Sequence, residues 1–193
     1  MNFLAHAWLG RGRDDDRVGG VIGDFVKGWL PAGLPPGLAE GVRLHRQIDS
    51  FAERHPAFQA SRARVSAARR RGAGIMVDLF YDHFLALRWS RHSEESLEAF
   101  ASTTYSLLER TACIPAPFAA LLPFMRDENW LIAYRSPARI AEVLDRMAVR
   151  RMRRPNSLAG GGEELLRHYA GFEADFLEFL PAAEAFVAEQ RRQ

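Results

Sequence analysis

The sequence has almost no cysteine, almost no lysine and no long hydrophobic run. The single cysteine, Cys113, cannot form an internal disulfide. Its neighbours Ile114 and Pro115 predict a buried residue near a helix end rather than a nucleophile. No apolar stretch approaches the roughly 20 residues that a membrane-spanning helix needs, and the N-terminus lacks the basic start and apolar stretch of a signal peptide. We therefore expect a cytoplasmic protein with no membrane partner.

Several sequence motifs of well-known enzymes are also missing. The chain has no phosphate-binding Gly-x-x-x-x-Gly-Lys loop, no Gly-x-Ser-x-Gly nucleophile elbow and no Cys-x-x-Cys pair. The glycine-rich stretches near residues 11 and 161 have no strand before them, so they predict loops and not a dinucleotide site. These absences exclude nucleotide hydrolysis by a P-loop, serine hydrolysis of that type and dithiol chemistry.

Positive charge is carried almost entirely by arginine, because Lys27 is the only lysine. The net charge is only +2, but many arginines are clustered. One cluster consists of Arg62, Arg64, Arg69, Arg70 and Arg71, and a second of Arg146, Arg150, Arg151, Arg153 and Arg154. Each cluster is either a solvated helix face or a surface for an anionic partner, since guanidinium groups bind phosphates and carboxylates.

The hydrophobic pattern is helical throughout and shows no strand-type alternation. Prolines and glycines divide it into expected helices at residues 16–29, 36–53, 57–70, 75–89, 93–111, 137–151 and 163–190, the last bent at Pro181. Either Ser93 or Ser96 is expected to cap the fifth of these. Together, 193 residues with 48% hydrophobic content predict one all-α domain over residues 1–193, an irregular bundle of about seven to nine helices.

Two polar residues lie on the apolar face of the helix expected at residues 36–53. At about 100° per residue, one sector contains Leu38, Val42, His45, Ile48, Asp49 and Ala52. His45 and Asp49 are thus one turn apart and face the core. They either satisfy one another as a buried hydrogen-bonded pair or belong to a functional site.

A second polar group lies in the strongly apolar helix expected at residues 75–89. Asp78 and Asp82 are one turn apart on one face, and His83 follows directly. Two buried carboxylates repel each other and lose their hydration, so a cation should lie beside them. An arginine is one candidate, and a divalent metal ion is the other.

Two further polar residues stand in apolar or glycine-rich surroundings. Asp24 follows Gly23 in a segment whose small residues allow close approach of a backbone or ligand, and His6 lies among Leu4, Ala5, Ala7 and Trp8. The combined set is His6, Asp24, His45, Asp49, Asp78, Asp82 and His83. Mixed imidazole and carboxylate groups suit a divalent ion that activates water for attack on a phosphoester.

At these residues the sequence resembles the acyl carrier protein phosphodiesterases. The similar segments are residues 1–6 (MNFLAH), 24–28 (DFVKG), 45–49 (HRQID), 78–85 (DLFYDHFL), 130–135 (WLIAYR) and 147–151 (MAVRR), in the expected order. The resemblance implies release of 4′-phosphopantetheine from holo-acyl carrier protein with the help of a divalent metal ion. That ion is typically Mn²⁺, and Mg²⁺ and Fe²⁺ are the alternatives. The same resemblance implies a helical fold like that of the HD-domain phosphohydrolases. The adjacent His-Asp pair of that fold is absent here, and only the reverse order Asp82–His83 occurs.

The resemblance also implies roles for individual residues. His6, Asp24, His45, Asp78 and Asp82 become the expected metal ligands. Asp24 is the foremost catalytic candidate, with Asp49 and His83 as orienting or proton-transfer groups. The expected docking surface for the acidic carrier protein consists of Arg150, Arg151, Arg153 and Arg154.

Two other functions fit the same residues. One is hydrolysis of another small phosphoester, such as a nucleotide, by the same metal chemistry. The other is a non-catalytic module that binds a carrier protein or a nucleic acid, although no aromatic platform for nucleic acid is evident. The sequence leaves the oligomeric state open.

Overall fold

The computed structural model describes residues 2–151 and 156–192, except for the side chains of Arg150 and Arg151. Every regular element in these ranges is a helix, and no strand occurs among them. The expected all-α fold class is therefore confirmed. In the described part of the chain, no helix is both long and apolar enough to cross a membrane.

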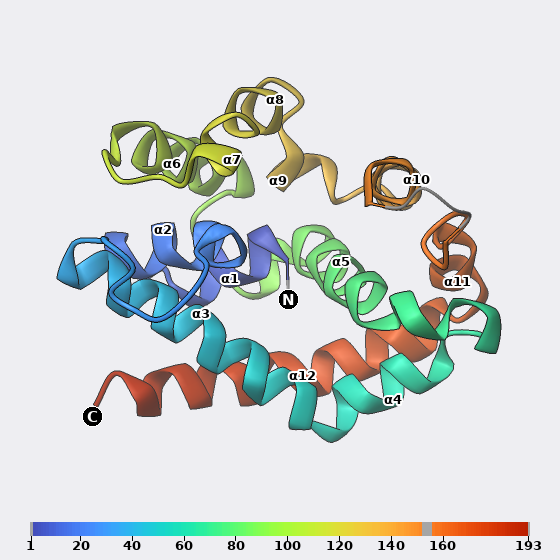
Figure 1. Ribbon diagram of the computed structural model, residues 1–193. Helices are drawn as coiled ribbons and strands as arrows, with labels where there is room; N and C mark the ends of the chain where they lie inside the picture. The colour runs from blue at the N-terminus through green and yellow to red at the C-terminus, as the bar shows by residue number, and fades with distance from the viewer. Residues whose placement is uncertain (1, 152–155, 193) are drawn as a thin grey trace.

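The helices follow one another with short connections (Figure 1). They are α1 (Phe3–Leu9), α2 (Asp14–Ile22), η1 (Gly23–Phe25), α3 (Pro36–Arg54), α4 (Pro56–Arg64), η2 (Ala67–Gly72), α5 (Ala73–Leu87), η3 (Trp89–Arg91), α6 (Leu97–Arg110), α7 (Ala116–Ala119), α8 (Leu122–Asp127), α9 (Trp130–Ala133), α10 (Pro137–Arg151), α11 (Gly162–Arg167) and α12 (Tyr169–Gln190). The η elements are single 3₁₀ turns or short 3₁₀ segments.

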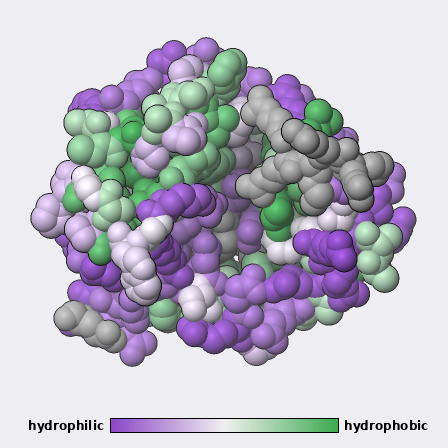
Figure 2. Space-filling model, in the orientation of Figure 1, coloured by the Kyte–Doolittle hydropathy of each residue, from purple (hydrophilic) through white to green (hydrophobic). Residues whose placement is uncertain are grey.

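Helix α5 lies at the centre of the bundle because nearly all of its side chains are apolar. It packs against α1 on one side and against α4 and α12 on the other. Aromatic rings fill the contact with α12: the Phe80 and Phe172 centroids lie 4.9 Å apart, and those of Tyr81 and Phe176 lie 5.6 Å apart. Figure 2 shows a hollow near the centre of the face that Figure 1 presents, with apolar surface gathered at the upper left, where α6 to α8 lie.

Glycines bring α1, α2 and α3 unusually close together. A Cβ added to Gly19 of α2 would lie 2.4 Å from the carbonyl carbon of Gly41 in α3. A Cβ on Gly20 would lie 2.8 Å from the carbonyl oxygen of His6, and one on Gly23 would lie 2.3 Å from the His45 ring. No side chain can occupy these positions without moving a neighbouring helix. The expectation that this glycine-rich segment permits close approach is confirmed.

Several expected boundaries are wrong. The helix expected at residues 16–29 ends at Ile22, since the chain tightens into the 3₁₀ turn η1 before Val26 becomes extended. The basic helix expected at residues 57–70 stops at Arg64, because Val65 is extended. The last helix is divided at His168, which leaves the α-helical conformation, and Pro181 lies inside α12.

Two smaller expectations can also be judged. Ser96, rather than Ser93, caps α6, because its hydroxyl oxygen accepts a hydrogen bond from the Ala99 amide. Cys113 is exposed, so its expected burial is wrong. The helix before it ends at Arg110, and the chain beyond runs along the surface, where no apolar partner covers the thiol.

Candidate metal and catalytic site

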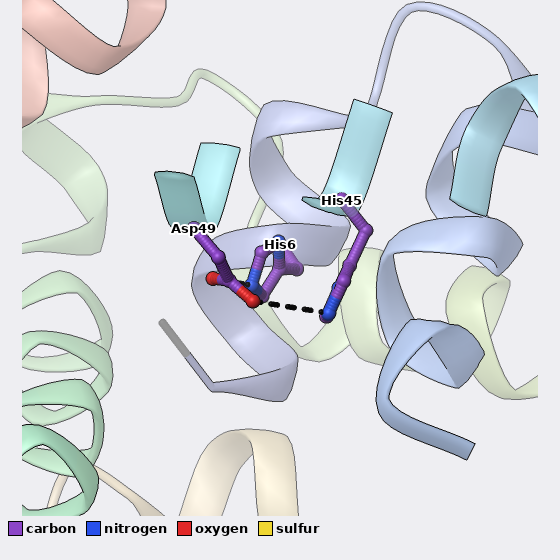
Figure 3. A group of neighbouring side chains, drawn as sticks. All are labelled: His6, His45 and Asp49. Atoms are coloured by element: carbon purple, nitrogen blue, oxygen red, sulfur yellow. Dashed lines mark hydrogen bonds and ion pairs between the residues drawn. The ribbon is translucent and has the colours of Figure 1, made fainter. Parts of the chain in front are cut away.

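Three residues from two helices form a compact cluster (Figure 3). His6 comes from α1, whereas His45 and Asp49 come from one face of α3. Each residue offers a ligand atom, and the three atoms all lie within 4.8 Å of one another. Among the described residues, no other group of three or more acidic, histidine or cysteine side chains meets this criterion.

The Asp49 carboxylate joins the two imidazoles. Its Oδ1 lies 2.9 Å from Nε2 of His6, and its Oδ2 lies 3.2 Å from Nε2 of His45. The two rings stack with their centroids 3.9 Å apart. Both histidines are buried, but Asp49 is 38% exposed, so the cluster reaches solvent on its carboxylate side.

A backbone carbonyl fixes the orientation of the His45 ring. Its Nδ1 lies 2.8 Å from the carbonyl oxygen of Gly20 and donates to it, so the proton of the neutral ring is at Nδ1. The lone pair of Nε2 then faces the carboxylates. This arrangement, with one nitrogen held by a carbonyl and the other free for an ion, is the usual one for a metal-binding histidine.

The two histidines have opposite pKa shifts. Burial lowers the pKa of His6 to about 3, and the neighbouring His45 lowers it further. Burial by itself would lower the pKa of His45, but hydrogen bonds from its ring to Asp24 and Asp49 outweigh that effect and raise the pKa to about 9. Burial would raise the pKa of Asp49, but the positive charge of the N-terminus and the hydrogen bonds from His45 and His6 together lower it. Without a metal ion, these shifts favour a protonated His45 beside ionised Asp24 and Asp49, with His6 neutral.

Asp24 lies at the open side of the cluster. It belongs to η1, its side chain is 69% exposed, and its Oδ1 lies 3.6 Å from Nε2 of His45. The hydrogen bond with His45 keeps the pKa of Asp24 below its ordinary value, although partial burial opposes this. The 3₁₀ turn that ends α2 thus carries the one exposed carboxylate that faces the His45 imidazole.

Asp78 of α5 interacts electrostatically with the carboxylates of Asp49 and Asp24. Burial raises its pKa against the opposing charge of the N-terminal ammonium, and the negative charges of Asp49 and Asp24 add a smaller rise. Three carboxylates thus influence one another around two imidazoles.

The other two predicted residues of α5 make their contacts elsewhere. The Asp82 carboxylate accepts hydrogen bonds from the amides of Leu4 and Ala5, at 2.8 and 2.9 Å, in the first turn of α1. Burial raises the pKa of Asp82 to about 7, although these two bonds oppose the rise. The nitrogens of His83 lie 2.9 Å from the Tyr134 carbonyl oxygen and 2.9 Å from the Tyr169 hydroxyl.

The predicted site residues therefore fall into distinct groups. His6, His45 and Asp49 come together, Asp24 adjoins them, and Asp78 interacts with their charges. Asp82 as a ligand and His83 as a proton-transfer group stay predictions. Of the proposed docking arginines, Arg153 and Arg154 and the side chains of Arg150 and Arg151 lie outside the described residues.

The Gly20 carbonyl, which holds the His45 ring, was not among the groups expected at the site. No residue type signals a backbone acceptor. The only clue was the run of glycines that lets α2 approach the His45 ring.

The donor set fits a divalent metal ion. Two imidazole nitrogens and a carboxylate, with a second carboxylate adjacent, are suitable ligands for manganese, iron, zinc and similar ions. One nitrogen of His6, Nδ1, is buried and has no hydrogen-bond partner among the described residues. Protein atoms therefore leave the imidazole pair incompletely satisfied, as expected where a ligand completes the site.

Comparison with known proteins identifies the family. The sequence model of the acyl carrier protein phosphodiesterase family matches residues 1–183. The acyl carrier protein phosphodiesterase of Photorhabdus laumondii is 37% identical over 183 residues, which cover 94% of this chain and 92% of that protein. Those of Pectobacterium atrosepticum and Escherichia coli O157:H7 are each 33% identical, with 94% of both chains covered. No solved structure matches the chain.

These matches extend over nearly the whole chain and confirm the resemblance drawn from the separate motifs. They include every residue of the cluster and both flanking carboxylates. The protein is an enzyme, a hydrolase, and it belongs to the acyl carrier protein phosphodiesterase family.

Proposed function

We propose that this enzyme hydrolyses the phosphodiester of holo-acyl carrier protein, releasing 4′-phosphopantetheine and apo-acyl carrier protein. The proposed site consists of His6, His45 and Asp49 as ligands of a divalent ion, with Asp24 at its open side. Mn²⁺ is the proposed ion. The main supporting observation is that a shared carboxylate and two stacked imidazoles converge within 4.8 Å.

The two buried histidines hold and orient the site. When bound, a divalent ion supplies positive charge that activates water and polarises the phosphodiester. His45 must then be neutral, and the Nδ1 proton donated to Gly20 leaves Nε2 as the ligand atom. The Asp49 carboxylate, which contacts both rings, orients them toward one point.

Asp24 is the proposed proton acceptor for the attacking water. Its carboxylate is exposed, so it is accessible from the side where substrate arrives. In the metal-free cluster its hydrogen bond with His45 lowers its pKa. If His45 Nε2 were a metal ligand, it would no longer donate to Asp24, and the Asp24 carboxylate would be left to accept a hydrogen bond from water.

The proposal is tested by two measurements on the purified protein. Titration calorimetry should show Mn²⁺ binding to wild type and its loss in Asp49→Asn. Mass analysis of holo-acyl carrier protein after incubation should show loss of phosphopantetheine with wild type and not with Asp49→Asn. Asp127→Asn is a matched control, because Asp127 is an exposed aspartate on α8 with no cluster contact. Unchanged binding and turnover in Asp49→Asn would refute the proposed ligand set.

A further inference from the structure

The chain segment that follows Asp24 is held in place by an arginine of α3. Arg46, which directly follows the cluster residue His45, donates from Nη2 to the Val26 carbonyl at 2.9 Å and from Nη1 to the Gly28 carbonyl at 3.0 Å. These carbonyls lie on either side of Lys27. A planar guanidinium with two fixed donors restrains both peptide groups at once. The position of Lys27 is therefore fixed relative to α3 and hence to His45.

Lys27 lies three residues after the candidate catalytic residue Asp24 and contacts its backbone. Its Nζ donates to the backbone carbonyl of Asp24 at 2.5 Å, and its side chain is exposed. An ammonium group has three donor hydrogens, so two are left for a ligand. Among the described residues, no ion pair involves Lys27, whereas most of the arginines with described side chains pair with acidic residues.

The sequence adds an independent observation. Of the 26 basic residues, Lys27 is the only lysine. Every other basic position in the chain is arginine, so position 27 alone presents an ammonium group. Ammonium is a compact charge with rotatable donors, whereas guanidinium is broad and planar, so the two are not interchangeable in a narrow site.

We propose that Lys27 binds a non-bridging oxygen of the substrate phosphodiester, and that Arg46 is the positioning residue that holds it there. The inference rests on the proposed function, because it places the scissile phosphate at the His6, His45 and Asp49 cluster. It adds a cationic subsite made by the chain itself. Because the contact is to the phosphate, every phosphodiester substrate uses it, whatever the size of the attached carrier protein.

The kinetic test is a set of matched variants. Lys27→Met should raise the Michaelis constant about 10- to 100-fold for holo-acyl carrier protein and for bis(p-nitrophenyl) phosphate alike, since one charged hydrogen bond is lost. Lys27→Arg should recover little of this. Arg46→Met should act in the same direction and less strongly, because Lys27 then loses its fixed position. Arg43→Met is the control: it removes an exposed charge of α3 that pairs with Glu40.

A second test needs no variant and does not measure activity. Reductive methylation with formaldehyde labels amines, and Lys27 is the only lysine side chain available. Saturating 4′-phosphopantetheine should slow labelling of Lys27 at least about fivefold, measured by mass spectrometry against N-acetyl-lysine methyl ester in the same tube. An unprotected Lys27, or an unchanged Michaelis constant in Lys27→Met, overturns the inference.

Metal binding separates this inference from the proposed function. Calorimetry should show equal Mn²⁺ affinity for wild type and Lys27→Met, because Lys27 contacts the phosphate and not the ion. A wild type that binds no Mn²⁺ would refute the proposed metal site and would leave the labelling result to decide the role of Lys27. A Lys27→Met protein that loses Mn²⁺ affinity would instead overturn the phosphate-binding role.

Discussion

The cluster of His6, His45 and Asp49 lies between α1 and α3, and the pair Asp82 and His83 lies on α5. The two groups differ in what their buried polar atoms contact. In the cluster, the carboxylate of Asp49 contacts the imidazoles of His6 and His45, so ionisable groups meet one another. In the pair, Asp82 and His83 contact backbone amides, a backbone carbonyl and a tyrosine hydroxyl. Groups of the first kind can exchange a proton for a metal ion. Groups of the second kind already have fixed partners, and they hold helices together.

Among replacements at the cluster, that of Asp24 should have the largest effect on turnover. Asp24→Asn keeps the shape of the side chain but removes its charge, so turnover should fall at least about 100-fold. The melting temperature should stay close to wild type, because the side chain is 69% exposed. Release of phosphopantetheine with Mn²⁺ and thermal melting without metal are the two measurements. A variant with wild-type melting and wild-type turnover would exclude Asp24 as a working residue.

Replacing Asp82 should have the opposite outcome, a loss of stability. Asp82→Ala leaves the buried amides of Leu4 and Ala5 without their acceptor, which should lower the free energy of unfolding by about 2–4 kcal/mol. Asp82→Asn keeps one acceptor oxygen and should lose about half as much. Urea unfolding measures both effects. Mn²⁺ affinity in Asp82→Asn should be unchanged. A tenfold loss would make Asp82 a metal ligand, and Asp82 would then belong with the cluster.

The same sequence signal, a polar residue on an apolar helix face, identified both groups but could not separate them. Helical spacing places His45 beside Asp49 without any tertiary information, and it places Asp78 on the same face as Asp82 equally well. The partner of Asp82 is the backbone of α1, and that of His45 Nδ1 is the backbone of α2. Every residue has the same backbone groups, so sequence patterns cannot predict which of them a side chain meets. The predicted end of the helix at residues 16–29 was wrong for a related reason, because Gly23 packs closely against the His45 ring, which lies far away in the sequence.

The pH dependence of stability should also distinguish the cluster. In metal-free protein the His45 pKa is raised to about 9 from 6.5. Protonated His45 therefore stabilises the fold fully below about pH 6.5, and this contribution is lost as the pH rises toward 9, on the order of 2–3 kcal/mol. Urea unfolding with a chelator at pH 6.5 and pH 9 measures the change. His45→Gln should flatten it, and equal slopes in the two proteins would contradict the assignment.

Saturating Mn²⁺ should reverse that trend in wild type. The ion and the proton compete for His45 Nε2, so metal affinity should increase over the range in which the proton is lost. The stabilisation given by a fixed Mn²⁺ concentration should therefore be larger at pH 9 than at pH 6.5. His45→Gln should show little stabilisation at either pH. Stabilisation that is independent of pH would mean that the ion binds without displacing a proton from the cluster.

The smallest expected effect concerns His83. Tyr169→Phe removes the hydroxyl that lies 2.9 Å from His83 Nε2 but keeps the ring that packs against His83 and Phe84. The loss of one neutral hydrogen bond should lower the free energy of unfolding by about 1 kcal/mol. Tyr105→Phe is a control away from His83; its hydroxyl donates to the Met125 carbonyl and accepts from the Leu131 amide, so a somewhat larger loss is expected. Turnover and its pH profile should match wild type in both variants if the hydrogen bonds of His83 serve only to hold the helices together. A shifted pH profile in Tyr169→Phe alone would show that His83 transfers a proton during catalysis, as its sequence position first indicated.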